Sequence, residues 1–144
     1  TVGSGAFVSG TNAGWAYNNF PYMGDNLLPP ILLNENLYTV SKLFNDIGFI
    51  QFFHRVLETL TLIYVLITFF HLFKSKLKAI YFLASLVAII AISQYLLGII
   101  MLKLFVPIHL GLSHQLGSLI LLSFLIITKC EIIKKRAINR PSFS

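Results

Sequence analysis

The side chains best able to do chemistry in this sequence lie inside long apolar runs. One of these runs reads Gln-Phe-Phe-His-Arg-Val-Leu-Glu from residue 51 to residue 58. Its polar members, Gln51, His54, Arg55 and Glu58, are spaced i, i+3, i+4 and i+7, so in a helix they form one polar stripe. Ionisable groups are costly inside a bilayer. The stripe is therefore expected to face protein or a cofactor.

A second polar pair lies in the last apolar run. His114 and Gln115 follow Gly111 and precede Gly117. Both glycines are three residues from His114, so in a helix they share its face. Such a face leaves room for a bulky group or for a closely packed neighbour.

The two histidines are expected at a similar depth if their helices cross the membrane in the same direction. His54 follows Ile47 by 7 residues and His114 follows Phe105 by 9, which correspond to about 10 and about 14 Å at the helical rise. Two imidazoles at matching depth are what a bis-histidine haem requires. Arg55 would then be placed to bind a propionate. The spacing equally supports histidines that only bond or relay protons between helices.

The other polar residues in the apolar runs give weaker indications. His71 is predicted at the headgroup level, and His109 is roughly 140° around the helix from His114 and so points elsewhere. Gln94 is predicted to bond a neighbouring helix or to line a cofactor pocket. Glu58 is predicted to pair with Arg55, three residues earlier. The sequence contains no motif of a soluble enzyme, and no catalytic residue is assigned.

Composition determines the kind of element that must position these residues. Of the 144 residues, 56% are hydrophobic and 11% are charged, whereas soluble domains carry roughly 25% charged residues. Disorder is excluded by the hydrophobicity, and a disulfide scaffold by the single cysteine, Cys130. The chain is therefore predicted to be an all-α polytopic membrane protein with the lipid bilayer as its surroundings.

The predicted elements follow from the lengths of the apolar runs, because about 20 helical residues cross a bilayer. Residues 1–14, with glycines suited to close helix packing, are interpreted as the end of a fourth helix whose beginning is missing. An outer loop with headgroup-level aromatic residues follows, and a short surface helix is expected from Leu37 to Phe44. The predicted segments are a partial helix (1–14), the outer loop (15–46), membrane helices (47–73, 79–102 and 105–128) and a basic inner tail (129–144).

The positive charges predict the orientation. Of the 11 basic residues, 8 lie in the connection 74–78 or in the tail from Lys129 onward. By the positive-inside rule, these segments face the cytoplasm or the mitochondrial matrix. The net charge of +6 is thus interpreted as a topology signal, and no nucleic-acid partner is predicted.

These residues resemble those of the haem A synthase family, which converts haem O to haem A for cytochrome oxidase. The similarity extends over nearly the whole chain and consists of several motifs in the same order. They are Gly5-Ala6-Phe7-Val8-Ser9-Gly10, Ala13-Gly14, Tyr17-Asn18, Phe20-Pro21-Tyr22-Met23-Gly24, Gln51-Phe52-Phe53-His54-Arg55, Gln94, Leu97-Gly98-Ile99, Val106-Pro107 and His114-Gln115-Leu116-Gly117-Ser118.

The resemblance implies an architecture of eight membrane helices in two similar halves, of which this chain is the second. In the family, the first half carries Glu-x-x-His-Arg and holds the haem O whose C8 methyl becomes a formyl group. The second half binds a haem b cofactor. Gln51 stands where the first half has glutamate, so the resemblance makes this chain the cofactor half, with His54 and His114 as axial ligands and Gln51, Arg55 and Gln115 as cofactor-binding residues.

The implied partners are the N-terminal half of the same enzyme, a haem O synthase and an electron donor, in a bacterial cell membrane or the mitochondrial inner membrane. Iron held by two histidines has no open position, which suits an electron relay. Glu58 departs from the family, which usually has a small residue there, and is expected to crowd the porphyrin. Two alternatives stay open: a non-enzymatic b-type cytochrome and a haem-free structural subunit.

Overall fold

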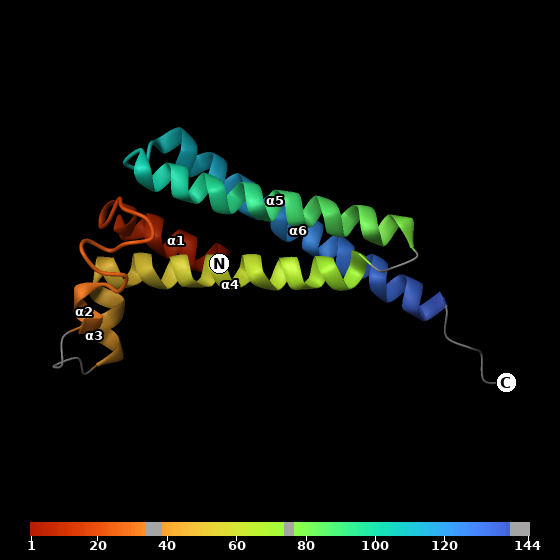
Figure 1. Ribbon diagram of the computed structural model, residues 1–144, viewed down its shortest axis with the longest axis horizontal. Helices are drawn as coiled ribbons and strands as arrows, with labels where there is room; N and C mark the ends of the chain where they lie inside the picture. Colours follow the sequence, from red (N-terminus) through yellow and green to blue (C-terminus); the bar gives the residue numbers. More distant parts are fainter. Residues whose placement is uncertain (34–38, 74–76, 139–144) are drawn as a thin grey trace.

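The computed structural model describes residues 1–33, 39–73 and 77–138. Over these residues, the chain is built from helices, three of which are long and apolar enough to cross a membrane. The prediction of an all-α polytopic membrane protein is confirmed. Figure 1 shows the long helices side by side along one axis, with the loop and the short helices gathered at one end.

Helix α4 (Ile47–Phe73) begins immediately after a capping residue and covers the predicted range 47–73. Oδ1 of Asp46 accepts a hydrogen bond of 2.7 Å from the backbone N–H of Phe49, one of the donors left free by the first turn. Helix α5 (Lys78–Lys103) extends one residue beyond the predicted range 79–102 at each end.

Helix α6 (Ile108–Ile138) differs from its predicted range of 105–128. Phe105 and Val106 have φ angles of 61° and 53°, in the left-handed region, so the chain reverses there and the helix starts after Pro107. The helix also continues past Thr128, so much of the segment predicted as a basic tail is helical. Residues 139–144 of that tail lie outside the described residues.

The N-terminal segment and the outer loop form short elements at the end of the molecule where α4 starts. Helix α1 (Val2–Gly10) and the 3-10 helix η1 (Ala13–Trp15) replace the single helix end predicted over 1–14. Helix α1 packs against α4 and also contacts α6. In the loop, α2 (Pro30–Leu33) precedes α3 (Val40–Asn45). The surface helix predicted over 37–44 thus corresponds to α3, and its residues 37 and 38 lie outside the described part.

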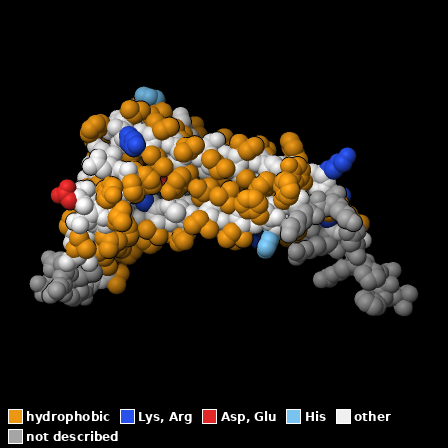
Figure 2. Space-filling model, in the orientation of Figure 1, with side chains coloured by type: hydrophobic (Ala, Val, Ile, Leu, Met, Phe, Trp, Pro, Cys, Tyr) orange, Lys and Arg blue, Asp and Glu red, His pale blue; other side chains and the backbone are white. Residues whose placement is uncertain are grey.

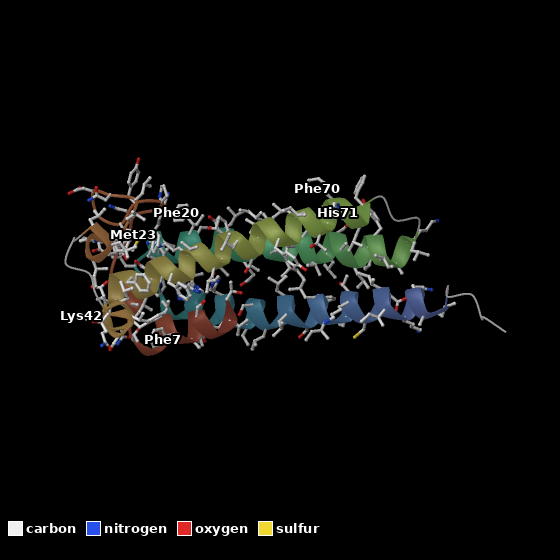
Figure 3. All side chains as sticks on the ribbon, turned by 90° about the horizontal axis from the view of Figure 1, so that it is seen from below. Phe7, Phe20, Met23, Lys42, Phe70 and His71 are labelled. Carbon is white, nitrogen blue, oxygen red and sulfur yellow. The ribbon has the colours of Figure 1, made fainter. Side chains whose placement is uncertain are left out.

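Aromatic side chains attach α3 to the end of α4 where that helix begins. The ring of Phe44 lies 5.5 Å from Phe49, 5.8 Å from Phe53 and 6.5 Å from Phe7, measured between centroids. Figure 3 shows Phe7, Met23 and Lys42 at this end, and Phe70 and His71 at the other. The cluster therefore joins α1, α3 and α4 close to the loop.

The three long helices pack through small side chains and leave most of their large apolar side chains exposed. Val65 of α4 and Val87, Ala88 and Ala91 of α5 form the buried core, and apolar residues of α6 pack against it. Figure 2 shows apolar side chains along the whole face in view and only scattered charged ones. Exposed apolar surface combined with small residues at the contacts is the arrangement expected in lipid.

Candidate functional site

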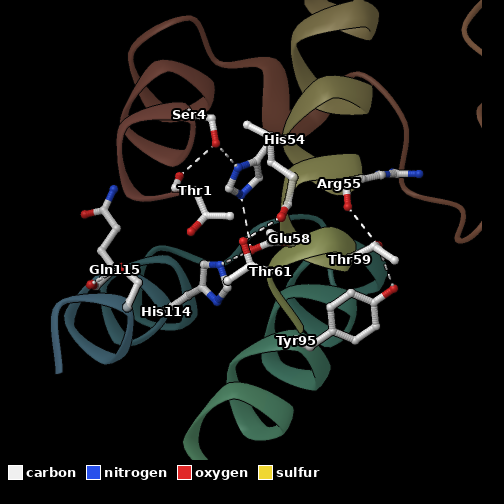
Figure 4. A network of polar contacts seen from close by, with 12 residues as sticks. Thr1, Ser4, His54, Arg55, Glu58, Thr59, Thr61, Tyr95, His114 and Gln115 are labelled. Carbon is white, nitrogen blue, oxygen red and sulfur yellow. Dashed lines mark hydrogen bonds and ion pairs between the residues drawn. The ribbon is translucent and has the colours of Figure 1, made fainter. Parts of the chain in front are cut away.

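Three ionisable side chains from two helices meet near the middle of the bundle. Oε1 of Glu58 lies 2.9 Å from Nε2 of His114 and 3.3 Å from Nε2 of His54. His54 and Glu58 belong to successive turns of α4, and His114 reaches across from α6 (Figure 4). The donor atoms of the three residues all lie within 4.8 Å of one another. The two histidines predicted at a common depth are therefore brought together with their Nε2 atoms converging.

The N-terminal helix fixes the orientation of the His54 ring. Oγ of Ser4 lies 2.8 Å from Nδ1 of His54 and donates its own hydrogen to the carbonyl of Thr1, also at 2.8 Å. This chain of contacts holds the opposite ring nitrogen, Nε2, toward Glu58 (Figure 4). Ser4 was not predicted as a site residue, and only the small-residue character of the segment around it indicated a close helix contact.

A glycine stands beside each histidine ring. A Cβ at Gly5 of α1 would lie 3.3 Å from Cε1 of His54, and one at Gly98 of α5 would lie 3.3 Å from Cε1 of His114. Contacts this short are tighter than ordinary van der Waals packing, so a side chain at either position would press on the ring. Backbone packing of α1 and α5 thus confines the two imidazoles.

A cavity of about 680 Å³ adjoins the cluster. Gln51, Gln94 and Gln115 are among its polar lining residues, and apolar side chains of α1, α5 and α6 supply much of the rest. The Oε1 atoms of Gln51 and Gln94 and the Nδ1 atom of His114 are buried and lack a hydrogen-bond partner among the described residues. The site therefore combines an apolar volume with polar atoms available to a bound molecule.

Arg55 turns away from the histidines and binds the outer loop. Its guanidinium donates hydrogen bonds to the backbone carbonyls of Tyr17 at 2.8 Å, Asn19 at 3.1 Å and Tyr22 at 3.2 Å. It also lies over the Phe20 ring, 5.8 Å from the centroid. Arg55 Nε is buried without a partner in the described part of the chain. The contact with a propionate predicted for Arg55 stays a prediction.

The residues of the polar stripe therefore have two roles: some bind the loop and the others face the cavity. Gln51 donates from Nε2 to the carbonyls of Gly14 and Tyr17, each at 3.0 Å, and so holds the loop together with Arg55. His54 and Glu58 face the cavity. The predicted pairing of Glu58 with Arg55 is wrong, because Glu58 is hydrogen-bonded to His114 and lies beside Nε2 of His54, and the Arg55 guanidinium is engaged with loop carbonyls.

The remaining polar residues lie outside the cluster or at the cavity wall. His109 is exposed in the first turn of α6 and His71 in the last turn of α4, both away from the cluster. The Gln94 side chain packs directly against Gly117, so the space beside that glycine is taken by a neighbouring helix. Gln115 is exposed at the cavity wall, and its cofactor contact stays a prediction.

Comparisons with known proteins bear on what this cavity holds. The sequence model of a family described as cytochrome oxidase assembly protein matches residues 1–126. The chain is 38% identical over 122 residues to a protein of Rickettsia prowazekii named "Heme A synthase", covering 85% of this chain and 36% of that protein. Two further relatives are both named "Heme A synthase COX15". The chain is 38% identical to the Bos taurus protein over 85% of this chain, and 36% identical to the Arabidopsis thaliana protein over 99% of this chain.

These matches cover only part of each relative. The chain spans about a third of their length, with 30% of both the Bos taurus and the Arabidopsis thaliana proteins matched. No solved structure matches the chain significantly.

Proposed function

The chain belongs to the cytochrome oxidase assembly protein family, and from that premise we propose that it forms the haem b-binding half of a haem A synthase. In this proposal, haem O is oxidised in the first half of the enzyme, and this half takes part as an electron relay in the electron transfer that the oxidation requires. The proposed location is a bacterial cell membrane or the mitochondrial inner membrane, and the three helices long and apolar enough to span a membrane support a membrane location. A haem O synthase and an electron donor are the proposed further partners, and the basic end of the molecule faces the cytoplasm or matrix.

The observation that carries the proposal is the convergence of two histidines beside a cavity. The Nε2 atoms of His54 and His114 point to one place from two helices, and the cavity of about 680 Å³ begins there. The donor set and the apolar walls fit a porphyrin with two axial imidazoles. Glu58 is the one misfit, because its Oε1 atom lies against both nitrogens and has to move aside.

When bound, haem b would supply a one-electron redox centre with no open coordination position. The residues of this chain hold and orient it. Ser4 fixes the tautomer and direction of His54, and such outer partners keep ligating histidines aligned. Gln51 and Gln115 are proposed to contact the cofactor from the cavity wall. Arg55 is the proposed donor to a propionate, and its guanidinium has to turn from the loop carbonyls toward the cavity to reach one.

Co-expression tests the enzymatic role. The chain is produced together with a first-half polypeptide carrying Glu-x-x-His-Arg, in cells that make haem O but no haem A. We expect extracted haem A only when both polypeptides are present, and none when the chain carries His114→Ala. Haem A formed equally without this chain would contradict the proposal.

Two other results would each identify a different function. A haem-loaded chain that never supports haem A formation would indicate a b-type cytochrome that only passes electrons to a partner. A well-folded chain that contains no haem would indicate a structural membrane subunit, in which the cluster serves helix packing.

A further inference from the structure

We propose that His54, Glu58 and His114 bind a divalent transition-metal ion, represented by Zn²⁺, and that this ion competes with haem for the two histidines. The ion site rests on the geometry of the three side chains alone. The competition rests in addition on the proposed haem-binding function.

The donor atoms are spaced as ligands of one ion. Glu58 Oε1 lies 2.9 Å from one imidazole nitrogen and 3.3 Å from the other. Two ligands bonded to zinc at about 2.0 Å and set at the tetrahedral angle lie about 3.3 Å apart. Two imidazoles and a carboxylate also form one of the ligand sets of catalytic zinc sites, where water fills the fourth position. The adjoining cavity provides space for that water.

The charge of Glu58 favours a cation at this position. The ion pairs that Glu58 makes within the described residues are with His54 and His114, which are charged only when protonated. The guanidinium of Arg55 is engaged with loop carbonyls instead. A carboxylate within a membrane helix is costly unless a cation or hydrogen-bond donors compensate it. A divalent ion among the three side chains supplies that compensation.

The hydrogen-bond network prepares His54 as a ligand. Because Ser4 Oγ gives its hydrogen to the carbonyl of Thr1, it accepts one from Nδ1 of His54. With the tautomer assigned from this network, Nε2 of a neutral His54 carries a lone pair that faces a carboxylate oxygen 3.3 Å away. Two acceptors in this position repel each other unless a proton or a metal cation lies between them. Ligating histidines typically have such a partner on their second nitrogen.

Ion and haem exclude each other because both need the same nitrogens. Glu58 is the only one of the three donors that the ion uses and haem does not. A small side chain at this position is therefore expected to abolish the ion site and to leave both histidines free for haem.

Zinc titration of the purified chain in detergent micelles tests the ion site. We expect one Zn²⁺ per chain by calorimetry and by metal content after dialysis. Glu58→Gln and Glu58→Ala should weaken binding at least about tenfold, since changes even in outer partners cost about 10–100-fold. Glu131→Gln is the matched control, because Glu131 lies on α6 beside Lys135, 4.0 Å from its Nζ, and away from the cluster. Unchanged affinity in Glu58→Gln, or an equal loss in the control, would overturn the site.

A haem titration with and without Zn²⁺ tests the competition. Zn²⁺ should raise the haem concentration needed for half-saturation in the wild-type chain and leave that of Glu58→Ala unchanged. If Zn²⁺ binds through Glu58 and haem uptake is unaffected, the competition is refuted. A chain that binds zinc but takes up no haem would refute the proposed function and support the ion site. A chain that binds haem but no zinc would refute the ion site and support the proposed function. Helical content by circular dichroism shows that each variant is folded.

Discussion

Arg55 is the residue through which the outer loop is attached to α4. Its two terminal nitrogens bind three loop carbonyls, and the side chain is only 8% exposed. Hydrogen bonds to a charged group contribute about 1.5–3 kcal/mol each, and carbonyls left unpaired on burial add to the loss. The loop is therefore expected to depend strongly on Arg55 for its position, with Gln51 as its second anchor.

Replacing the guanidinium tests this dependence. We expect Arg55→Met to lower the free energy of unfolding in detergent by on the order of 3 kcal/mol and to expose the loop around Asn19 to proteolysis. Lys42→Met, at an exposed position on α3, should change neither. Equal stability of the two variants would show that the loop is held by other contacts.

Residue-scale predictions from the sequence succeeded where helical geometry determines the answer. The rise per residue indicated that His54 and His114 lie at one level, and the structure brings them together. The partner of Glu58 was predicted wrongly, because spacing along one helix permits an Arg55 contact but contains no information on the loop carbonyls that occupy Arg55. Ser4 was missed for the same reason, since its contact with His54 crosses between helices.

At the scale of elements, α5 and α6 meet closely at Gly117. The end of the Gln94 side chain occupies the space where a Cβ at Gly117 would stand. We expect Gly117→Ala to push this flexible side chain aside and to destabilise the chain by at most about 1 kcal/mol, measured by unfolding in detergent. At Gly111, a Cβ would lie 3.9 Å from the Met101 sulfur, an ordinary contact, so Gly111→Ala should be tolerated.

A second substitution tests whether the effect is steric, because Gly→Ala in a helix interior by itself raises helix propensity. Gly117→Ala combined with Gln94→Ala should recover most of the lost stability, because the clash is removed from the other side. If the double variant is no more stable than the summed effects of the two single variants predict, the steric contact between Gln94 and Gly117 is refuted.

Element boundaries were predictable where a local signal exists. Apolar run length located α4 and predicted the range 47–73, and the structure adds that Asp46 caps its start. The start of α6 was predicted three residues too early. Phe105 and Val106 have a left-handed backbone, and because Phe and Val rarely adopt it, nothing in the sequence indicates a turn there. Its continuation to Ile138 was missed because polar residues were assumed to end the helix at the membrane surface.

For the molecule as a whole, the fold class followed from composition and run length alone, and the structure confirms it. The orientation of the chain in the membrane is a separate prediction, because it depends on which side of the membrane the lysine-rich segments face. The single cysteine, Cys130, is exposed near Lys129 and offers a natural probe.

A membrane-impermeant maleimide tests the orientation. We expect Cys130 to react only after the membrane is permeabilised, because it adjoins the basic segment on the inner side. On a Cys130→Ser background, Asn26→Cys places a thiol in the outer loop, at an exposed position, and should react in intact spheroplasts. The reverse labelling pattern would invert the topology.

If His54 and His114 together hold one haem b, the purified, haem-loaded chain has the absorption spectrum of a haem with two axial histidines. We expect one low-spin b-type haem per chain, converted to a high-spin spectrum or lost in His54→Ala and in His114→Ala. The spectrum should be unchanged in His109→Ala, since His109 is exposed and outside the cluster. A low-spin spectrum that survives either substitution within the cluster, or a folded chain that binds no haem, would contradict it.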